Sequence, residues 1–425
     1  MEQVVEEEKI AAIPRLRFSG FSKDWRKSEL GAHTDVSKLA GYEFTKHIVY
    51  ADDGRIIAIR GLNVKHGQLD LSNVKYIDDS DFSKLERSRL HIDDMLFTYI
   101  GTIGDVALIE EEDRFYLAPN VARLRFDTEV LFPRFMLRLF EVPTFQNREV
   151  QRHVATSSQP ALSMTNIRKF VIHLPTLPEQ QKIAAFLGAV DRKIQQLKRK
   201  QELLEQYKKG VVQQLFSQQL RFKRQDGGEF PEWEEKRLGD VGETYNGLTG
   251  KAGADFGEGV PFITYKQIFA SSKIDLALCE YVRIEPGENQ TRAEKGDAFF
   301  TTSSETREEV GFASVLLDDV DDMYLNSFSF GYRIHSHKIL SPDFARFLFR
   351  SEGFREDMIK LGQGSTRYNI SKTGFREITV QLPSHEEQSR IAGFLMSLDA
   401  KVAGVAQAVA AAQRWKKGLL QQMFV

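Results

Sequence analysis

The sequence predicts an α+β protein with two strand-rich domains and two long helices that pair as an antiparallel coiled coil. Three observations support this fold class. The 43 residues 174–216 return at 382–424, an offset of 208, with 16 identical positions. In both copies apolar residues keep a heptad spacing over about four heptads, which is typical of coiled coils. Short β-branched and aromatic runs, punctuated by Gly, Asn and Asp, fill much of the remaining chain.

The repeat also includes the starts of the two halves, so the organisation is circular. Residues 16–18 and 220–222 both read Leu-Arg-Phe, and Trp25 matches Trp233. A repeat this long indicates two domains rather than a solenoid of short units. We expect domain one at 1–175, helix one at 176–218, domain two at 219–383 and helix two at 384–425. The chain termini should then lie close together.

Each predicted helix begins with a capping box. Thr176 is followed three residues later by Glu179, and Ser384 by Glu387. Each helix is about 40 residues long, which corresponds to about 60 Å. The apolar stripe of each helix needs a partner, and the other helix is the simplest one. Antiparallel pairing separates the two domains, whereas parallel pairing would crowd them together.

Polar residues interrupt the apolar seam of the coil at Gln201, Lys208 and Lys416. They could specify the register of the coil or contact a third helix. Alternatively, the lysine stems simply extend along a wet end of the coil. We expect the second explanation to hold.

Composition indicates a soluble, cytoplasmic protein. The 58 Lys and Arg residues nearly balance the 60 Asp and Glu residues, and apolar residues make up 41% of the chain. The single cysteine, Cys279, excludes an internal disulfide. No uninterrupted run of 18 apolar residues exists, and the acidic N-terminus does not resemble a signal peptide. Positive charge is concentrated at 178–224, which holds eleven Lys or Arg against four Asp or Glu.

Catalytic motifs are absent from the sequence. It has no GxxxxGK[ST] phosphate loop, no HExxH zinc motif and no Asn-Pro-Pro-aromatic methyltransferase motif. His335 and His337 are close in sequence but have no Asp, Glu or Cys nearby at ligand spacing. We therefore expect no catalytic residue, no metal site and no cofactor in this chain, and a function in binding.

The repeated motifs resemble those of the specificity (S) subunit of type I restriction–modification enzymes. The strongest is Leu-Pro-xxx-Glu-Gln, followed by Ile-Ala, Phe-Leu and Asp-x-Lys, at 174–193 and 382–401. Lys-Lys-Gly-xx-Gln-Gln-x-Phe ends both helices, and the domains contain Asp94-Met-Leu-Phe-Thr98 and Asp297-Ala-Phe-Phe-Thr301. The likeness covers nearly the whole chain.

The resemblance implies that each domain is a target recognition domain that reads one half of a bipartite, asymmetric site in double-stranded DNA. It implies that the paired helices dock two modification (M) subunits, with Phe186 and Phe394 as docking residues. Those subunits bind S-adenosylmethionine and methylate adenine. Restriction (R) subunits complete an ATP- and Mg-dependent nuclease. The resemblance also implies that the protein acts in a restriction system through DNA binding and DNA methylation, without a membrane.

Direct base readout needs Arg, Lys, Asn, Gln, Ser or Thr side chains on loops. The candidates in domain one are Arg60, Asn63, Lys65, His66, Tyr99, Thr102, Ser157, Ser158 and Gln159. The candidates in domain two are Tyr265, Lys266, Gln267, Thr302, Ser303, Ser304, Arg307, Ser365, Thr366, Arg367 and Tyr368. The alternative function is a non-enzymatic coiled-coil scaffold that binds two protein partners.

Overall fold

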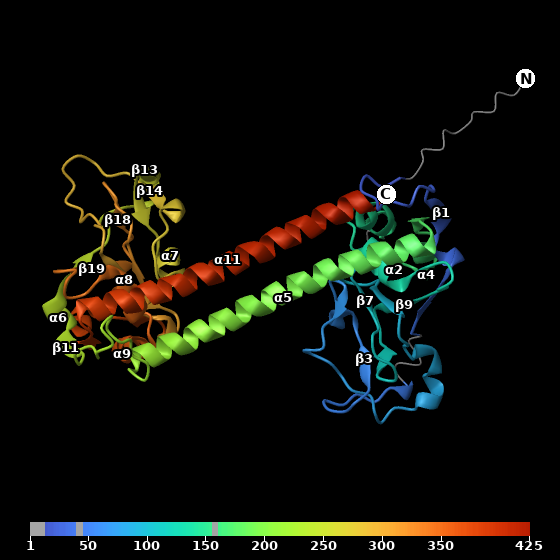
Figure 1. The fold of residues 1–425 in the computed structure, drawn as a ribbon, viewed down its shortest axis with the longest axis horizontal. Helices are drawn as coiled ribbons and strands as arrows, with labels where there is room; N and C mark the ends of the chain where they lie inside the picture. Colours follow the sequence, from blue (N-terminus) through green and yellow to red (C-terminus); the bar gives the residue numbers. More distant parts are fainter. Residues whose placement is uncertain (1–12, 40–45, 155–159) are drawn as a thin grey trace, which may run out of the picture. The chain divides into compact units, whose positions relative to one another are not determined.

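The computed structural model describes residues 13–39, 46–154 and 160–425 (Figure 1). They form two compact units, unit 1 from 1–198 with 407–425, and unit 2 from 199–406. The long helices are α5 (Leu177–Phe216) and α11 (His385–Met423). Each unit therefore contains one strand-rich domain, the beginning of one long helix and the end of the other. In unit 1 the N–H of Leu16 donates to the carbonyl of Gln422 at 2.8 Å, so the first described residues lie beside the end of α11.

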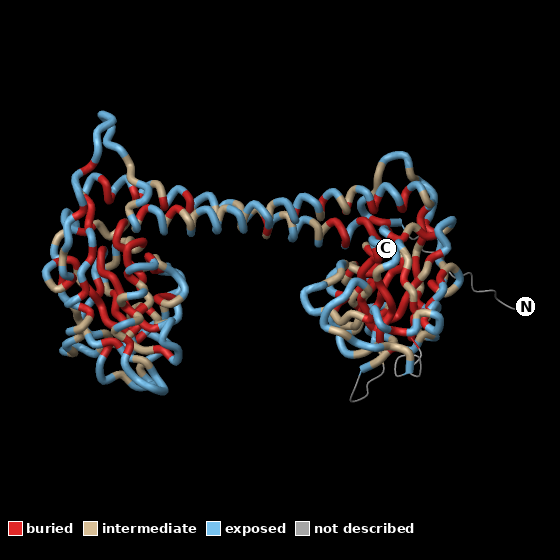
Figure 2. Tube along the Cα trace, turned by 90° about the horizontal axis from the view of Figure 1, so that it is seen from below, coloured by how far each residue is buried: buried red, intermediate tan, exposed pale blue. Residues whose placement is uncertain are grey.

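Unit 1 is built on an antiparallel sheet that is buried on both faces. Its strand order is β2 (Thr34–Lys38), β9 (Val121–Phe126), β6 (Met95–Thr98) and β7 (Val106–Leu108). In β6, Met95 and Phe97 belong to the core on the helix side, whereas Leu96 belongs to a second core. Burial on both faces explains why β6 is an unbroken apolar run instead of an alternating one. Figure 2 shows the buried segments inside each unit.

Smaller elements complete unit 1. The strands are β1 (Arg26–Glu29), which pairs with β10 (Val171–Leu174), β3 (Ile57–Ile59), which pairs with β8 (Phe115–Leu117), and β4 (Val64–Lys65), which pairs with β5 (Gln68–Leu69). The short helices are α2 (Pro133–Phe140), α3 (Pro143–Phe145) and α4 (Met164–Arg168). The β1–β10 ribbon leads directly into α5.

Unit 2 repeats this plan. Its central sheet has the order β12 (Gly242–Asn246), β19 (Ser329–Ile334), β15 (Ala298–Thr301) and β17 (Ala313–Val315). The other strands are β13 (Phe256–Ile263) between β14 (Glu280–Val282) and β18 (Tyr324–Leu325), β16 (Ser303–Ser304) with β20 (Tyr368–Asn369), and β11 (Glu234–Arg237) with β21 (Thr379–Leu382). The helices are α6 (Leu238–Val241), α7 (Tyr265–Ala270), α8 (Pro342–Leu348), α9 (Glu352–Leu361) and α10 (Lys372–Arg376).

Each long helix is anchored at its start by a buried glutamate. The carboxylate of Glu179 accepts from Arg17 at 2.6 and 2.8 Å, and that of Glu387 accepts from Arg221 at 3.2 and 3.0 Å. The expected capping boxes are therefore incomplete, because each glutamate side chain turns to an arginine instead of back to the helix N-terminus. The repeated Leu-Arg-Phe segments supply these arginines, so the circular organisation has a physical link in both units.

Replacing Glu387 by alanine should destabilise unit 2 by about 3 kcal/mol, because it leaves the largely buried Arg221 guanidinium with only the exposed Glu232, at 3.5 Å, as a charge partner. Arg221 keeps 17% of its side chain exposed, which places the loss at the lower end of the usual range. Urea unfolding monitored by circular dichroism measures this loss. The control is Glu386→Ala, since Glu386 is exposed on the same helical turn. Equal stabilities for the two variants would contradict the anchoring role.

The lysines that interrupt the seam do not lie at a wet end, so that expectation was wrong. In unit 1, Lys416 of α11 pairs with Asp191 of α5 at 2.8 Å, and Arg138 of α2 reaches the same carboxylate at 2.7 Å. In unit 2, Lys208 of α5 and Arg346 of α8 both pair with Asp399 of α11. In each unit one aspartate thus joins the two long helices to a helix of the domain.

One helix among the described residues, α11, is long and apolar enough to cross a membrane when judged by length and composition alone. Polar residues interrupt its Ala- and Val-rich middle part, so it contains no uninterrupted run of 18 apolar residues. Asp399 on this helix is held by Lys208 and Arg346 within unit 2. Through these ion pairs α11 packs against α5 and α8 of unit 2.

Candidate nucleic-acid interface

Four of the candidate residues in domain one surround a single hollow of about 640 Å³. These are Arg60, Lys65, His66 and Thr102. The two residues His66 and Gly67 have φ values of 49° and 84°, which form the tight turn between β4 and β5. That turn places Lys65 and His66 at the edge of the hollow, although they lie about 40 residues before Thr102 in the sequence.

Polar contacts hold the cations around this hollow. The Arg60 guanidinium donates to the Asn73 carbonyl at 2.9 Å, and Lys65 pairs with Asp70 at 2.7 Å. Asn63 is fully buried and donates to the carbonyls of Asp70 and Asn73. Its amide is therefore fully used within the domain. Asn63 positions the loop that carries Arg60 and Lys65, and does not face a ligand itself.

The remaining candidates of domain one differ in accessibility. Thr102 is exposed in the turn after β6, whereas Tyr99 is buried with its ring under the Lys38 ammonium at 5.5 Å. Burial raises the pKa of Tyr99, so its hydroxyl stays protonated and can donate. Ser157, Ser158 and Gln159 lie outside the described residues.

In domain two the structure brings together three segments that are far apart in sequence. Ser303 and Ser304 form β16, which pairs with Tyr368 and Asn369 of β20. The Tyr265 hydroxyl donates to the Ser303 carbonyl at 2.8 Å. The candidates near 265, 303 and 367 therefore belong to one surface. Strand β13 ends at Ile263, and Tyr265 begins α7.

The segment 363–369 forms an exposed turn at this surface. Gln363 and Asn369 exchange two backbone hydrogen bonds, and Gly364 has a φ of 137°. A side chain at Gly364 would approach the Arg367 carbonyl to 2.1 Å, so the turn requires glycine. Arg367 is exposed at this turn, together with Ser365 and Thr366.

Other candidates of domain two have structural partners. Gln267 is buried, where its carbonyl accepts from the Asp275 N–H and its amide faces the Cys279 sulfur. Arg307 is exposed, but its Nε donates to the Ile359 carbonyl at the end of α9. Lys266 is exposed, while Thr302 is half-buried. Of these residues, Lys266 is the freest to meet a ligand.

Two arginines that sequence reasoning missed hold backbone segments near this surface, Arg355 the loop at 305–312 and Arg350 the end of α7 and the start of β17. Arg355 donates to the carbonyls of Glu308, Val310 and Gly311, and Arg350 donates to four other carbonyls. Their guanidinium groups both lie over the ring of Phe312, at 4.2 and 4.7 Å. Burial lowers the pKa of each to about 10, and both remain charged at neutral pH. Nothing in the sequence distinguishes them from surface arginines.

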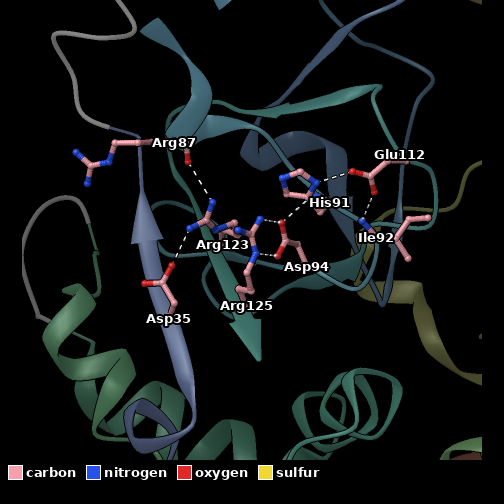
Figure 3. A network of polar contacts seen from close by, with 8 residues as sticks. All are labelled: Asp35, Arg87, His91, Ile92, Asp94, Glu112, Arg123 and Arg125. Atoms are coloured by element: carbon pink, nitrogen blue, oxygen red, sulfur yellow. Dashed lines mark hydrogen bonds and ion pairs between the residues drawn. The ribbon is translucent and has the colours of Figure 1, made fainter. Parts of the chain in front are cut away.

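The aspartate of each repeated domain motif is buried and holds the central sheet. Asp94 accepts from Arg125 through two bonds of 2.7 Å, and it also accepts from the His91 N–H (Figure 3). Its counterpart Asp297 accepts from Arg333 and from the Tyr245 hydroxyl. Figure 3 also shows Arg123, which joins Asp35 of β2 to the carbonyl of Arg87. These motif residues therefore shape the domains and are not themselves presented to a ligand.

Among the residues that the structure describes, no group of three or more His, Cys, Asp or Glu side chains could hold a metal ion. The polar surfaces described above present hydroxyl, amide and cationic groups, and the carboxylate of Asp105 also lines the hollow of domain one. The hydroxyl, amide and cationic groups suit hydrogen bonding to bases and pairing with phosphates.

A sequence profile described as the type I restriction modification DNA specificity domain matches residues 23–206 and again residues 231–408. The chain belongs to this family. The two matches begin 208 residues apart, which is the offset of the internal repeat. Each specificity domain includes one of the two strand-rich domains and most of the long helix that follows it.

Proteins similar in sequence to this chain are specificity subunits of type I restriction enzymes. It is 29% identical over 224 residues to the putative type I restriction enzyme MjaX specificity subunit of Methanocaldococcus jannaschii, covering 49% of this chain and 52% of that one. It is 24% identical over 161 residues to the EcoBI specificity subunit of Escherichia coli, covering 38% and 34%. The chain thus spans about half, or less, of the length of these relatives.

Solved structures share the fold over nearly the full length. The S subunit of a type I restriction–modification system from M. genitalium has a TM-score of 0.55 at 15% identity, and covers 97% of this chain and 99% of its own. The HsdS subunit from Thermoanaerobacter tengcongensis has a TM-score of 0.52 at 18% identity, with coverages of 94% and 96%. At identities of 15% and 18%, the likeness shows that the chain shares the fold of these subunits, and no more than the fold.

Proposed function

We propose that this protein is the non-catalytic DNA-recognition subunit of a type I restriction–modification complex. The observation that carries the proposal is the double match to a DNA specificity domain, with a polar surface in each unit. Each unit would read one half of a bipartite site in double-stranded DNA. Because the two surfaces differ in sequence, the two half-sites would differ as well.

The methylome of the host, with and without this gene, tests the proposal. We expect one bipartite N6-methyladenine motif to be lost when the gene is deleted. An unchanged methylome, with the gene expressed beforehand, would reject the proposed function.

Equivalent aromatic surfaces in the two units support docking of two identical partners. Phe18, Phe186 and Trp415 form a chain of edge-to-face contacts in unit 1, at 5.6 and 6.1 Å. In unit 2, Phe222 and Phe394 meet in the same way at 5.6 Å. The matching residues Trp415 and Tyr207 are 55% and 54% exposed. Exposed aromatic side chains of this kind are typical anchors of protein interfaces. The partners would be two M subunits, to which R subunits are added.

Disrupting both aromatic surfaces should abolish assembly with M. We expect Tyr207→Asp with Trp415→Asp to leave free S subunit, and either single variant to leave a complex with one M subunit. These exposed positions avoid the unfolding that changes at the half-buried Phe186 and Phe394 could cause. Native mass spectrometry measures the stoichiometry, and Gln206→Asp, at an exposed position beside Tyr207, is the control. An intact complex of two M and one S from the double variant would count against this docking surface.

Arg367 should read a base in the half-site of domain two. Arg367→Ala should weaken discrimination at one base pair by about 1–3 kcal/mol, the value of a good bidentate arginine–guanine contact. Methylation rates on duplexes mutated in one half-site at a time measure this loss. Arg237→Ala is the control, because Arg237 is an exposed arginine of the β11–β21 ribbon. Arg307→Ala should act on the same half-site. If the Arg367→Ala variant discriminates between the duplexes as well as the wild type does, Arg367 does not contact a base.

The alternative, a scaffold that binds two proteins and no DNA, makes an opposite prediction for duplex binding. Recognition of DNA requires a mobility shift that weakens steeply with salt, because phosphate contacts release counterions. The S–M complex is the appropriate sample, since this chain has a net charge of −2 and is not strongly basic. Absence of any shift at low salt would favour the scaffold.

A further inference from the structure

Each unit contains a small pocket beside a tryptophan, and the two pockets occupy matching positions. Trp25 lines a pocket of about 350 Å³ in unit 1, together with the β1–β10 ribbon. Trp233 lines a pocket of about 350 Å³ in unit 2, together with strand β21 of the β11–β21 ribbon. Both indole N–H groups are buried and have no hydrogen-bond partner among the described residues. A buried donor without an acceptor is uncommon in proteins, and it calls for an explanation.

The two pockets have opposite charge. The unit 1 pocket is lined by Lys27, Arg148 and Arg152, and the unit 2 pocket by Glu352, Glu356 and Asp357. At the repeat offset of 208, Arg148 of the first pocket corresponds to Glu356 of the second, so the charge is reversed at this position. The strand registers match the ribbons themselves, since Lys27 is opposite His173 in the first ribbon and Glu235 is opposite Gln381 in the second.

The cations of the unit 1 pocket are not neutralised within the protein. Lys27, Arg148 and Arg152 form no ion pair with any residue that the structure describes, and all three are exposed. The Glu149 carboxylate in the same pocket accepts from the Val171 N–H at 2.8 Å and is the single acidic side chain in the lining, against three cations. Burial, and after it Lys27 and Arg148, lowers the pKa of His173, so this ring is neutral at neutral pH. The pocket thus combines three free cations with a buried donor that needs an acceptor.

We propose that the unit 1 pocket binds an acidic peptide segment of a protein partner, with a carboxylate that accepts from the Trp25 indole and pairs with Arg148. A pocket of about 350 Å³ admits one or two side chains, whereas a DNA duplex presents its phosphates on a broad convex surface. The acidic pocket of unit 2 repels the same segment. The segment therefore binds once per chain, although the two units offer equivalent aromatic surfaces for docking.

Indole N–H resonances provide a direct test, because the chain has three tryptophans, of which Trp25 and Trp233 line pockets of opposite charge and Trp415 is exposed. The sample is the full chain labelled with ¹⁵N-tryptophan, with resonances assigned from single Trp→Phe variants. The probes are hexaglutamate, hexaglutamine, inorganic phosphate and a duplex of arbitrary sequence. We expect hexaglutamate to shift the Trp25 resonance and to leave those of Trp233 and Trp415 in place, whereas hexaglutamine shifts none.

Charge variants identify the pocket as the binding site. Arg148→Glu should weaken hexaglutamate binding at least tenfold, and Arg148→Gln should weaken it less. Arg134→Glu is the control, because Arg134 is an exposed arginine of unit 1 that does not line this pocket. Unchanged dispersion of the three indole resonances verifies that each variant is folded.

Several results would overturn the proposal. One is a Trp25 resonance that no probe moves. A second is a shift caused by phosphate or duplex at concentrations equal to or below those of hexaglutamate, which would indicate a phosphate site. A third is a Trp25 shift in the free chain on changing Glu6, Glu7 and Glu8 to glutamine, which would indicate that the chain's own acidic segment is the ligand.

Discussion

A half-protein of residues 1–220 will assemble as a dimer in sedimentation experiments. In the full chain, the core of unit 1 includes Leu419, Leu420, Met423 and Phe424 from the end of α11. The half-protein lacks these four residues. Exposing the surface that they cover is unfavourable by about 25 cal/mol per Å² of apolar area.

A second copy of the half-protein can supply the missing side chains. At the repeat offset of 208, the four residues correspond to Val211, Val212, Leu215 and Phe216 at the end of α5. All four are apolar, and in unit 2 they pack into the equivalent core. Two copies that exchange these helix ends form an isologous dimer with a two-fold axis. With M subunits, such a dimer should methylate a palindromic bipartite site made of two domain-one half-sites.

Charge reversal tests this arrangement sharply. In the full chain Asp191 pairs with Lys416, and Lys208 pairs with Asp399. Because Lys208 is the repeat counterpart of Lys416, the half-protein dimer contains two Asp191–Lys208 pairs between its copies. Asp191→Lys should therefore yield a monomer, and the double variant Asp191→Lys with Lys208→Asp should restore the dimer. A monomeric half-protein, or an Asp191→Lys variant that still dimerises, contradicts the exchange of helix ends.

The helical part of the fold could be predicted from the sequence because its pattern is long and repeated. Heptad spacing fixed the type of α5 and α11, and the repeat fixed the relation between the two halves. The inner strands of the central sheets, β6, β9, β15 and β19, could be found as apolar runs, since both faces of each sheet are buried there. The edge strands β2 and β12 are rich in polar residues and have no such run. The pairing of those strands, and the position of Tyr265 at the start of a helix, depend on tertiary contacts that leave no local signal.

The ion pairs between the long helices could not be predicted from the sequence. Asp191 and Lys416 are visible as repeated charges, but their pairing requires knowledge of which helix faces which. The same limit affected Glu179. Its position in the sequence is compatible both with a capping box and with a buried ion pair to Arg17. In both cases the residue type was informative, and the partner was decided by long-range packing.

The candidate site was predicted in part. The candidates near 265, 303 and 367 come together in domain two, and those near 60, 65 and 102 come together in domain one. Asn63 and Gln267 are buried, so they position loops instead of facing a ligand. Residue type and loop position cannot distinguish a residue that contacts a base from a residue that positions the loop. Both kinds of residue are polar, and both lie near turns.

Lengthening both long helices by one heptad should change the gap of the recognised site and leave its bases unchanged. Each helix has two anchor points, one in each unit, and in both helices they lie seventeen residues apart, at Asp191 and Lys208 in α5 and at Asp399 and Lys416 in α11. The helices must therefore stay equal in length between their anchors. Seven residues added after Leu197 and seven after Val405 keep the heptad register and preserve every ion pair.

Each inserted heptad adds about 10 Å of helix, which corresponds to about three base pairs at 3.4 Å each. We expect methylation of the original motif to disappear, and a motif with the same half-sites and a gap longer by about three base pairs to appear. The half-sites are kept because no residue of either strand-rich domain changes. Sequencing of methylated bases from a host that carries the variant measures both effects.

Insertion into α5 alone is the matched comparison for this experiment. It leaves α11 seven residues too short, so one of the two aspartate ion-pair networks must break, either at Asp191 or at Asp399. We expect that variant to lose methylation of every gap length, whereas the double insertion keeps full activity on the longer gap. If the double insertion still methylates the original gap, the long helices do not set the spacing between the half-sites, and the distance is fixed by the partner subunits.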